Sequence, residues 1–375
     1  MASSISTEGA ARPDVKIERV RAAAYRIPGD DPDAESTLPW DITTMITVHI
    51  DAGGLRGFGY GFADPATAVL INETLAPTLT GSDPLSPQAC WGVAWGRLRS
   101  SGQTGISACA VSVVDCALWD LKARLLGVSL VRLLGQVRTD IRAYGSGGFT
   151  SYGEAKLRAQ IDSWMADGMN AVKIKIGGGG VRDLDQVEIA RDSIGREADL
   201  FLDGQGAYTP KQALGYAARF ADFGVTWFEE PVPADDLDGL GLVRRRGPSG
   251  MSIAAGESVW SVADVRRILQ VGAVDVVQAD ATRCGGITGF LQIAAICEAF
   301  QTPLSSHGAP SLHAHLCCAT SRVLHAEYFH DHARLEIALL DGAARVHGGR
   351  LVADSSSPGL GLTLKQSDAE PHRVA

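Results

Sequence analysis

The sequence has no stretch of about 18 consecutive apolar residues, the length that a helix needs to cross a membrane. Residues 1–14 also lack the apolar centre of a signal peptide and are typical of a loose polar tail. Basic residues are not in excess, because 34 Lys and Arg stand against 43 Asp and Glu, a formal net charge of −9. Without a basic stripe to neutralise phosphates, we expect neither nucleic acid nor a membrane as a partner.

Cysteine is scarce, and its spacing is not that of a disulfide framework or a paired CxxC metal site. The seven cysteines are odd in number and scattered through apolar, helix-like sequence: Cys90, Cys109, Cys116, Cys284, Cys297, Cys317 and Cys318. This usage favours reduced thiols and a cytoplasmic location. Cys317 and Cys318 lie near His313 and His315, which suggests zinc, but core packing is the preferred interpretation because paired spacing is missing.

The length exceeds one average domain. A chain of 375 residues suits a barrel of roughly 250 residues joined to a second domain of about 120. Apolar residues make up 45% of the chain and charged residues 21%. These values are typical of a globular protein with a sizeable core.

Eight short apolar runs recur along the last two thirds of the chain, each followed by polar residues and a helical stretch. They span 142–148, 171–177, 200–206, 227–231, 253–257, 276–280, 303–308 and 324–329. Amphipathic helices are expected between them, for example over 211–223 and 262–271. This rhythm predicts a parallel α/β barrel rather than an open doubly wound sheet.

The first third has a different pattern. Residues 45–51 and 57–61 predict two strands of a hairpin, and helices are expected over 66–75, 86–98 and 107–126. Two or three strands followed by helices indicate a separate α+β unit. Its Gly-, Pro- and Asp-rich loops, 28–40 and 53–62, are candidates for a lid over the barrel mouth.

Polar side chains close the apolar runs of the predicted barrel. They are Lys173, Lys175, Asp203, Glu229, Glu257, Asp280, His307 and Glu327. Because the carboxyl ends of barrel strands meet at one face, these residues are expected to converge. A lone strand-end acid is more often a helix cap, but three in register favour a metal site. Three hard oxygen ligands favour Mg²⁺, so the pattern predicts an enzyme that moves protons beside a metal.

Side-chain alternation places Lys173 and Lys175 on the same face of their strand and Glu230 on the face opposite to Glu229. Two neighbouring ammonium groups near a metal are expected to lower each other's pKa, which would let one act as a base. Glu230 is left out of the ligand set for the same geometric reason. The polar C-terminal end, residues 366–375, is expected to fray.

The motifs in this order resemble the enolase superfamily, and within it the mandelate racemase subgroup. The residues that carry the resemblance are Lys173-Ile174-Lys175, Asp203, Glu229-Glu230-Pro231, Gly256-Glu257, Asp280 and Ser306-His307, with Asp115 and Ala117-Leu118-Trp119-Asp120 in the last long cap helix. The resemblance covers nearly the whole chain and implies a modified TIM barrel, (β/α)7β, with an N-terminal α+β capping domain. The implied division is a tail over 1–14, a cap over 15–138, a barrel over 139–335 and a segment over 336–375 that returns to the cap.

The resemblance also implies a role for each site residue. Asp203, Glu229 and Glu257 would bind Mg²⁺, and Lys175 would be the acid/base on one face of the substrate. Lys173 would lie beside the substrate carboxylate. Asp280 and His307 would form the acid/base dyad on the other face. Glu327 would donate a hydrogen bond to the substrate carboxylate, which requires a protonated side chain and therefore a raised pKa.

The implied activity is removal of the proton beside a carboxylate, which gives an enediolate. Dehydration of a sugar acid to a 2-keto-3-deoxy acid is the first choice, racemisation or epimerisation the second, and cycloisomerisation of a lactone or anhydro sugar acid the third. A structural or binding protein that retains the fold is the non-enzymatic alternative, although no ligand or base is missing. A homo-oligomer is expected by resemblance.

The substrate itself is not specified by the sequence. Gln205 follows a metal ligand where many subgroup members carry a shorter amide, so it is expected to reach into the pocket. Trp40 is a candidate for stacking on the substrate. The lid acids Asp30, Asp31, Asp33 and Glu35 would disfavour a second substrate carboxylate if they face inward.

Overall fold

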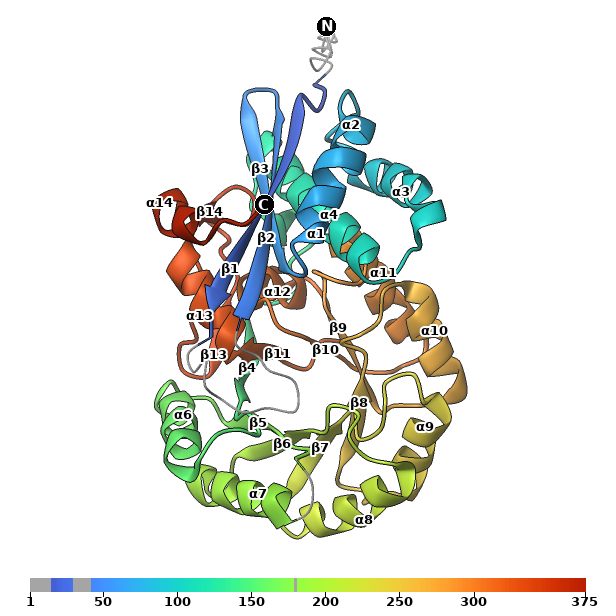
Figure 1. Cartoon of the computed structure of the whole chain (residues 1–375), viewed down its shortest axis with the longest axis vertical. Coiled ribbons are helices and arrows are strands. Elements are labelled where there is room, and N and C mark those ends of the chain that lie inside the picture. Colours follow the sequence, from blue (N-terminus) through green and yellow to red (C-terminus); the bar gives the residue numbers. More distant parts are fainter. Residues whose placement is uncertain (1–14, 30–41, 179–180) are drawn as a thin grey trace, which may run out of the picture.

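The computed structural model describes residues 15–29, 42–178 and 181–375. The cap, at the top of Figure 1, contains an antiparallel sheet in the order β1 (Arg19–Pro28), β2 (Ile42–Ala52) and β3 (Leu55–Phe62). The two predicted hairpin strands are thereby confirmed with longer bounds. The third strand, β1, pairs with β2 from Ile42 to Asp51.

Helices cover one face of the cap sheet. They are α1 (Ala66–Leu70), a π-helical turn η1 (Ile71–Leu75), α2 (Ala76–Leu79), α3 (Pro87–Arg97), a 3-10 turn η2 (Arg99–Ser101), α4 (Ile106–Leu125) and α5 (Leu130–Leu133). The buried helix α4 lies directly against β3. A Cβ atom at Gly57 or Gly59 would come within 2.4 Å of a backbone oxygen of α4, so this close approach requires glycine.

The eight predicted barrel strands are all present, although most end earlier than the apolar runs. They are β4 (Asp140–Gly147), β5 (Ala171–Lys175), β6 (Asp199–Asp203), β7 (Val225–Glu229), β8 (Ser252–Ala255), β9 (Val276–Ala279), β10 (Leu304–Ser306) and β11 (Ala326–Phe329). They form one parallel sheet in the order β10-β9-β8-β7-β6-β5-β4-β11. Only isolated backbone contacts join β10 to the segment before β11, so the barrel is nearly closed.

A helix follows each of the first seven barrel strands, which confirms the modified TIM barrel. These helices are α6 (Glu154–Ala166), α7 (Val181–Ile194), α8 (Pro210–Ala221), α9 (Leu237–Arg246), α10 (Val262–Val271), α11 (Gly286–Ala299) and α12 (Pro310–Cys318). They surround the strands in Figure 1. Thr209 begins α8 with a capping box to Gln212.

Aromatic side chains fill the interior of the barrel below the polar strand ends. Phe201 and Trp227 stack with their ring centroids 5.3 Å apart, and Tyr144 meets Phe201 edge-on. Phe201 precedes Asp203, and Trp227 precedes Glu229, by two residues. Because strand side chains alternate, the same inward face carries an aromatic floor and, one step higher, the carboxylates.

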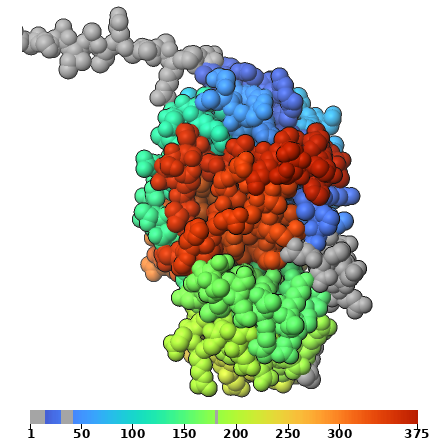
Figure 2. All heavy atoms as spheres, turned by 90° about the vertical axis from the view of Figure 1, so that its left-hand side faces the viewer, coloured from blue at the N-terminus to red at the C-terminus, as the bar shows by residue number. Residues whose placement is uncertain are grey.

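The C-terminal segment is ordered and returns to the cap. After β11 come α13 (His330–Leu339), β12 (Leu340–Asp341), β13 (Arg350–Val352), β14 (Thr363–Leu364), α14 (Gln366–Ala369) and a 3-10 turn η3 (Glu370–His372). Figure 2 shows these red and orange residues between the blue cap and the green part of the barrel. The expectation that residues 366–375 fray is wrong, because their end pairs with β1. The Ala24 backbone N–H donates to the Ala375 carbonyl at 3.0 Å, and the Val374 N–H donates to the Ala24 carbonyl at 2.9 Å.

Asp120 of α4 connects three parts of the chain. Its carboxylate accepts hydrogen bonds from the backbone of Phe58 in β3 at 2.7 Å and of Leu360 at 2.6 Å, and it pairs with Arg124 at 2.6 Å. Its side chain is fully buried.

Asp120→Ala is therefore expected to lower the free energy of unfolding by about 3–5 kcal/mol, because buried donors lose a charged acceptor. Urea unfolding measures this loss. Asp162→Ala, at an exposed position of α6, is the control and should change stability by less than about 0.5 kcal/mol. Equal effects would show that Asp120 does not join these segments.

A second buried acid links the cap to the barrel. Glu336 of α13 accepts hydrogen bonds from the Tyr60 hydroxyl of β3 at 2.6 Å and from the Ser311 backbone of α12 at 2.9 Å. Burial raises the pKa of Glu336 from its usual 4.5 to about 7.

Between pH 5 and pH 7, roughly, folded Glu336 keeps a proton that the unfolded chain has lost, so stability falls as pH rises through this window and levels off above it. The wild type is expected to lose about 3 kcal/mol relative to Glu336→Gln across the window, by urea unfolding at each pH. A difference that does not change with pH would contradict the raised pKa.

In the part of the chain that the structure describes, no helix is long and apolar enough to cross a membrane. All seven cysteines are buried and free. Cys317 and Cys318 lie on α12 and pack in the hydrophobic core, which is the interpretation that the sequence favoured.

Candidate metal and proton-transfer site

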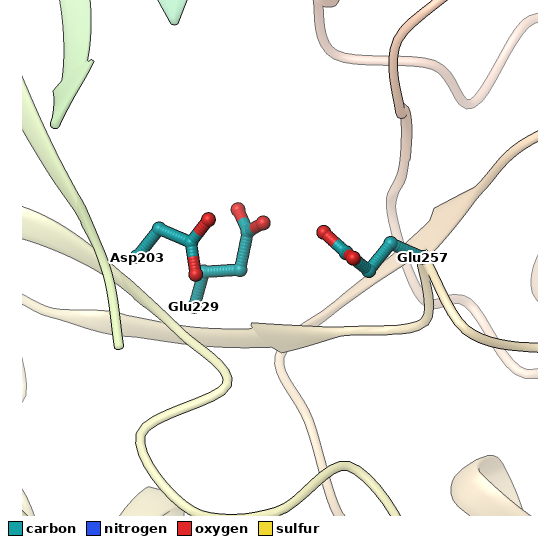
Figure 3. A group of neighbouring side chains, drawn as sticks. All are labelled: Asp203, Glu229 and Glu257. Atoms are coloured by element: carbon teal, nitrogen blue, oxygen red, sulfur yellow. The ribbon is translucent and has the colours of Figure 1, made fainter. Parts of the chain in front are cut away.

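Three carboxylates from neighbouring strands lie together at the carboxyl end of the barrel. Asp203 ends β6, Glu229 ends β7, and Glu257 follows β8. One carboxylate oxygen of each residue lies within 4.8 Å of one oxygen of each of the others. Among the described residues, these three acids form the group that could hold a metal ion. In Figure 3, Asp203 and Glu229 lie side by side and Glu257 points toward them from across a gap. An all-oxygen donor set of this size fits Mg²⁺.

Such a cluster of like charges needs compensation by cations. Burial raises the pKa of Glu229 to about 7, and repulsion from Asp203, Glu327 and Glu257 adds to this effect, whereas Lys173 opposes it. The Trp227 indole N–H also donates to Glu229 at 3.1 Å and fixes its orientation. A divalent cation among the three acids would supply the missing positive charge.

The two lysines of β5 point into this site. The Lys173 ammonium lies 2.7 Å from Glu229 and 2.8 Å from Glu327, and the Lys175 ammonium lies 2.8 Å from Asp203. As expected, the charge of Lys173 lowers the pKa of Lys175, but this effect does not decide the net direction. Burial lowers both pKa values, but attraction to the carboxylates outweighs it and raises them.

His307 and Asp280 meet on the other side of the acids. The His307 Nδ1 lies 2.9 Å from Asp280 Oδ2, and its Nε2 lies 3.3 Å from Glu257 Oε2. Burial lowers the pKa of His307, but Glu257, Glu327 and the hydrogen bond to Asp280 outweigh it and raise the pKa to about 10. The imidazole is therefore oriented by one acid and directed at another.

Glu327 of β11 lies in the site, but its pKa is lowered, which is opposite to the direction expected for a protonated side chain. Ser146 Oγ donates to it at 2.6 Å and the Gly308 backbone at 2.7 Å, in addition to the contact with Lys173. Burial raises its pKa, but Lys173 and His307 outweigh burial and lower the pKa to about 2. Glu327 thus holds Lys173 in position.

Glu230 departs from the strand geometry that was assumed for it. Its backbone has φ +35°, in the left-handed region, directly after β7 ends. The side chain is buried, and burial together with repulsion from Glu257, Asp203 and Glu229 raises its pKa well above the usual value. Glu230 is not a member of the group of three acids with metal-binding potential, in line with its exclusion from the ligand set.

Of the two residues expected to contact substrate, Gln205 lies among the described residues and Trp40 does not. Gln205 is exposed, with φ +49°, and its backbone N–H donates to Asp203 at 3.0 Å. Trp40 and the lid acids Asp30, Asp31, Asp33 and Glu35 lie outside the described residues.

The sequence reasoning missed one cation of this site. Arg283 follows Asp280 by three residues, and its guanidinium lies 3.6 Å from both Asp280 and Glu257. Its position after a barrel strand was an available signal, because the loops at this face carry the functional residues.

Two family models match the chain. The model described as "Mandelate racemase / muconate lactonizing enzyme, N-terminal domain" matches residues 32–135, and the model described as "Enolase C-terminal domain-like" matches residues 156–369. Together they cover the cap and most of the barrel.

Three similar proteins illustrate the range of relatives. A 3,6-anhydro-alpha-L-galactonate cycloisomerase of Streptomyces coelicolor is 32% identical over 93% of this chain and 97% of its own length. A mandelate racemase/muconate lactonizing enzyme-like protein from Rubrobacter xylanophilus has a TM-score of 0.93 at 46% identity, over 96% of this chain and 100% of that one. L-Talarate dehydratase from Polaromonas sp. JS666, complexed with Mg and L-glucarate, has a TM-score of 0.85 at 29% identity, over 96% and 98%.

Proposed function

Since this chain belongs to the enolase superfamily, in its mandelate racemase and muconate lactonizing enzyme group, we propose that it is a hydro-lyase that converts a sugar acid into a 2-keto-3-deoxy acid. The chain is an enzyme, and its cofactor is Mg²⁺. The proposed ligands are Asp203, Glu229 and Glu257. The proposed acid/base groups are Lys175 on one side and His307 with Asp280 on the other.

One observation carries the proposal. An ammonium and an imidazole contact opposite members of the row of acids, Lys175 at Asp203 and His307 at Glu257. A substrate carboxylate placed over the acids would therefore have a proton-transfer group at each end. This arrangement suits a reaction that removes a proton at one carbon and assists a leaving group at the next.

The chain's own residues divide the steps of such a reaction. Neutral Lys175 takes the proton beside the carboxylate and leaves an enediolate. Lys173, held by Glu229 and Glu327, stabilises the negative charge that develops on the carboxylate oxygens. Protonated His307, oriented by Asp280, donates a proton to the departing β-hydroxyl. Water leaves, and the resulting enol takes a solvent proton at the β-carbon and releases its hydroxyl proton to become the keto acid.

When bound, Mg²⁺ supplies Lewis-acid stabilisation of the developing charge and compensates the charge of the three carboxylates. This compensation matters for Lys175, because the acids raise its pKa. A base must be neutral when it accepts the proton.

Cycloisomerisation of a sugar lactone or anhydro sugar acid is the second candidate. It is favoured by the 32% identity to the Streptomyces coelicolor cycloisomerase. Its first step is the same α-proton removal, but an internal ring oxygen leaves in place of water. The same residues serve both outcomes, so the substrate decides between them.

A library of sugar acids, hydroxy acids and their lactones, incubated with Mg²⁺ in D₂O, separates the candidates. Formation of a keto acid from an open-chain acid would support the dehydratase proposal. Turnover of cyclic substrates alone would show instead that the enzyme is a cycloisomerase. Deuterium uptake at the α-carbon without keto acid would make the enzyme an epimerase or racemase. No turnover and no exchange across the library would favour a binding protein.

A further inference from the structure

A cavity of about 520 Å³ lies where the cap meets the barrel. The cap contributes Arg26 of β1, Thr43 of β2, and Phe62 and Asp64 at the end of β3. The barrel contributes Arg283 from the loop after β9 and His332 from α13. None of these residues has a role in the proton transfers proposed above.

The barrel side of the cavity adjoins the proton-transfer site. The guanidinium of Arg283 lies 3.6 Å from Asp280 and from Glu257. The ring of His332 stands edge-on to that of His307, with centroids 6.4 Å apart. The cavity therefore borders the site, within reach of the far end of an extended substrate that is held at the acids and His307.

His332 is a fixed hydrogen-bond donor in the wall of the cavity. Its Nδ1 accepts the backbone N–H of Ala309 at 3.1 Å, so the ring proton is on Nε2 in the neutral tautomer. Phe62 stacks on the imidazole with centroids 3.6 Å apart and planes 9° from parallel. Burial, followed by the charge of His307, lowers the pKa of His332 to about 3, so the ring adds no charge.

Formal charge in the cavity is positive. Its lining contains two arginines, Arg26 and Arg283, and one carboxylate, Asp64, which accepts the Ala66 backbone N–H at 2.8 Å. Arg283 shares its charge with Glu257 and Asp280. Within residues 15–29, 42–178 and 181–375, by contrast, Arg26 forms no ion pair, so its charge is available to a ligand.

We propose that this cavity binds the terminal carboxylate of a sugar diacid, and that Arg26 selects diacids over the matching monoacids. The inference rests on the proposed function, since it assumes that the first carboxylate lies over the acid cluster. A planar guanidinium donates two parallel hydrogen bonds to a carboxylate, and the opposite charges strengthen them. A terminal hydroxymethyl group has one oxygen and no charge, so it cannot form this pair. The donor Nε2–H of His332 is suited to a hydroxyl along the same substrate.

Steady-state kinetics on pairs of hexaric and hexonic acids, which differ only at the terminal carbon, test this assignment. The wild type is expected to prefer the diacid. Arg26→Gln is expected to raise KM for the diacid about tenfold while kcat stays within about twofold, because the lost contact is made equally in ground state and transition state. KM for the monoacid should not change, and Arg26→Lys should restore part of the diacid affinity.

Arg21→Gln is the matched control, because Arg21 is also exposed on β1 but does not line the cavity. Equal effects of Arg21→Gln and Arg26→Gln would overturn the proposal, as would a wild-type preference for monoacids. A preference for an aldonic acid with a terminal phosphate would also overturn the proposal, because the cavity would then bind a phosphate and not a carboxylate.

Calorimetry keeps this inference separate from the proposed reaction. Diacid and monoacid are titrated into the Mg²⁺-loaded wild type and the Arg26→Gln variant. Without turnover of any acid, tighter diacid binding that is lost in Arg26→Gln would still support the cavity assignment. Equal binding of both acids would overturn it whatever the reaction.

Discussion

Lys175→Ala is expected to lower kcat for keto-acid formation by about a thousandfold or more, within the range that positioned general bases contribute. The ammonium reaches the site from β5 and contacts Asp203 at 2.8 Å. Alanine leaves no proton acceptor on that side of the substrate. Lys211→Ala removes an exposed lysine of α8 and should leave kcat unchanged.

Metal binding separates a lost base from a damaged site in Lys175→Ala. The ammonium competes with a cation for Asp203, so its removal should leave Mg²⁺ affinity equal or tighter. Lost turnover with intact Mg²⁺ binding, measured by calorimetry, supports Lys175 as the base. A variant that keeps turnover within about tenfold of the wild type would contradict that role.

His307→Asn complements this variant. Asparagine keeps a hydrogen-bonding group next to Asp280 but cannot donate an acidic proton to the leaving hydroxyl. Keto-acid formation should be lost in both variants, whereas exchange of the α-proton should persist only where the abstracting base remains. Exchange in His307→Asn but not in Lys175→Ala is therefore the expected pattern.

Asp203→Asn is expected to weaken Mg²⁺ binding by more than about a hundredfold, because even supporting residues of metal sites contribute tenfold to hundredfold. Activity should fall in parallel, since the enediolate loses its main electrostatic stabilisation. Removal of Mg²⁺ from the wild type with a chelator should likewise abolish turnover, and adding Mg²⁺ should restore it.

The control for this variant lies on the same strand. Asp199 begins β6, whereas Asp203 ends it, and Asp199 pairs with Arg142 at 2.7 Å. Asp199→Asn should keep the Mg²⁺-induced rise in melting temperature, which Asp203→Asn should lose. The same Mg²⁺-induced rise in both variants would exclude Asp203 as a ligand.

Much of the fold and of the acid/base constellation could be predicted because both follow from strand periodicity. Alternation puts Phe201 and Asp203 on one inward face, and parallel strands bring their carboxyl ends together. These rules act over a few residues, so they can be read from the sequence. They do not extend past the end of a strand, where Glu230 adopts a left-handed backbone conformation that the sequence pattern did not indicate.

Charge states and distant contacts could not be predicted in the same way. The pKa of Glu327 depends on Lys173 and His307, which come from two other strands, and the net effect reverses the expected direction. The order of the C-terminal end depends on pairing between Val374 and Ala24, at opposite ends of the chain. The cavity between cap and barrel is likewise lined by residues far apart in the sequence, such as Arg26 and Arg283.

The most direct test of the central claim is loss of the substrate α-proton, followed by proton NMR in D₂O with a sugar diacid and Mg²⁺. The account predicts that the α-proton signal disappears with the wild type and that one deuterium enters the keto acid. It also predicts no change after Mg²⁺ is chelated or in Lys175→Ala. Keto acid formed at an undiminished rate without Mg²⁺, or an unchanged α-proton with Mg²⁺ and a diacid that calorimetry shows to be bound, would contradict it.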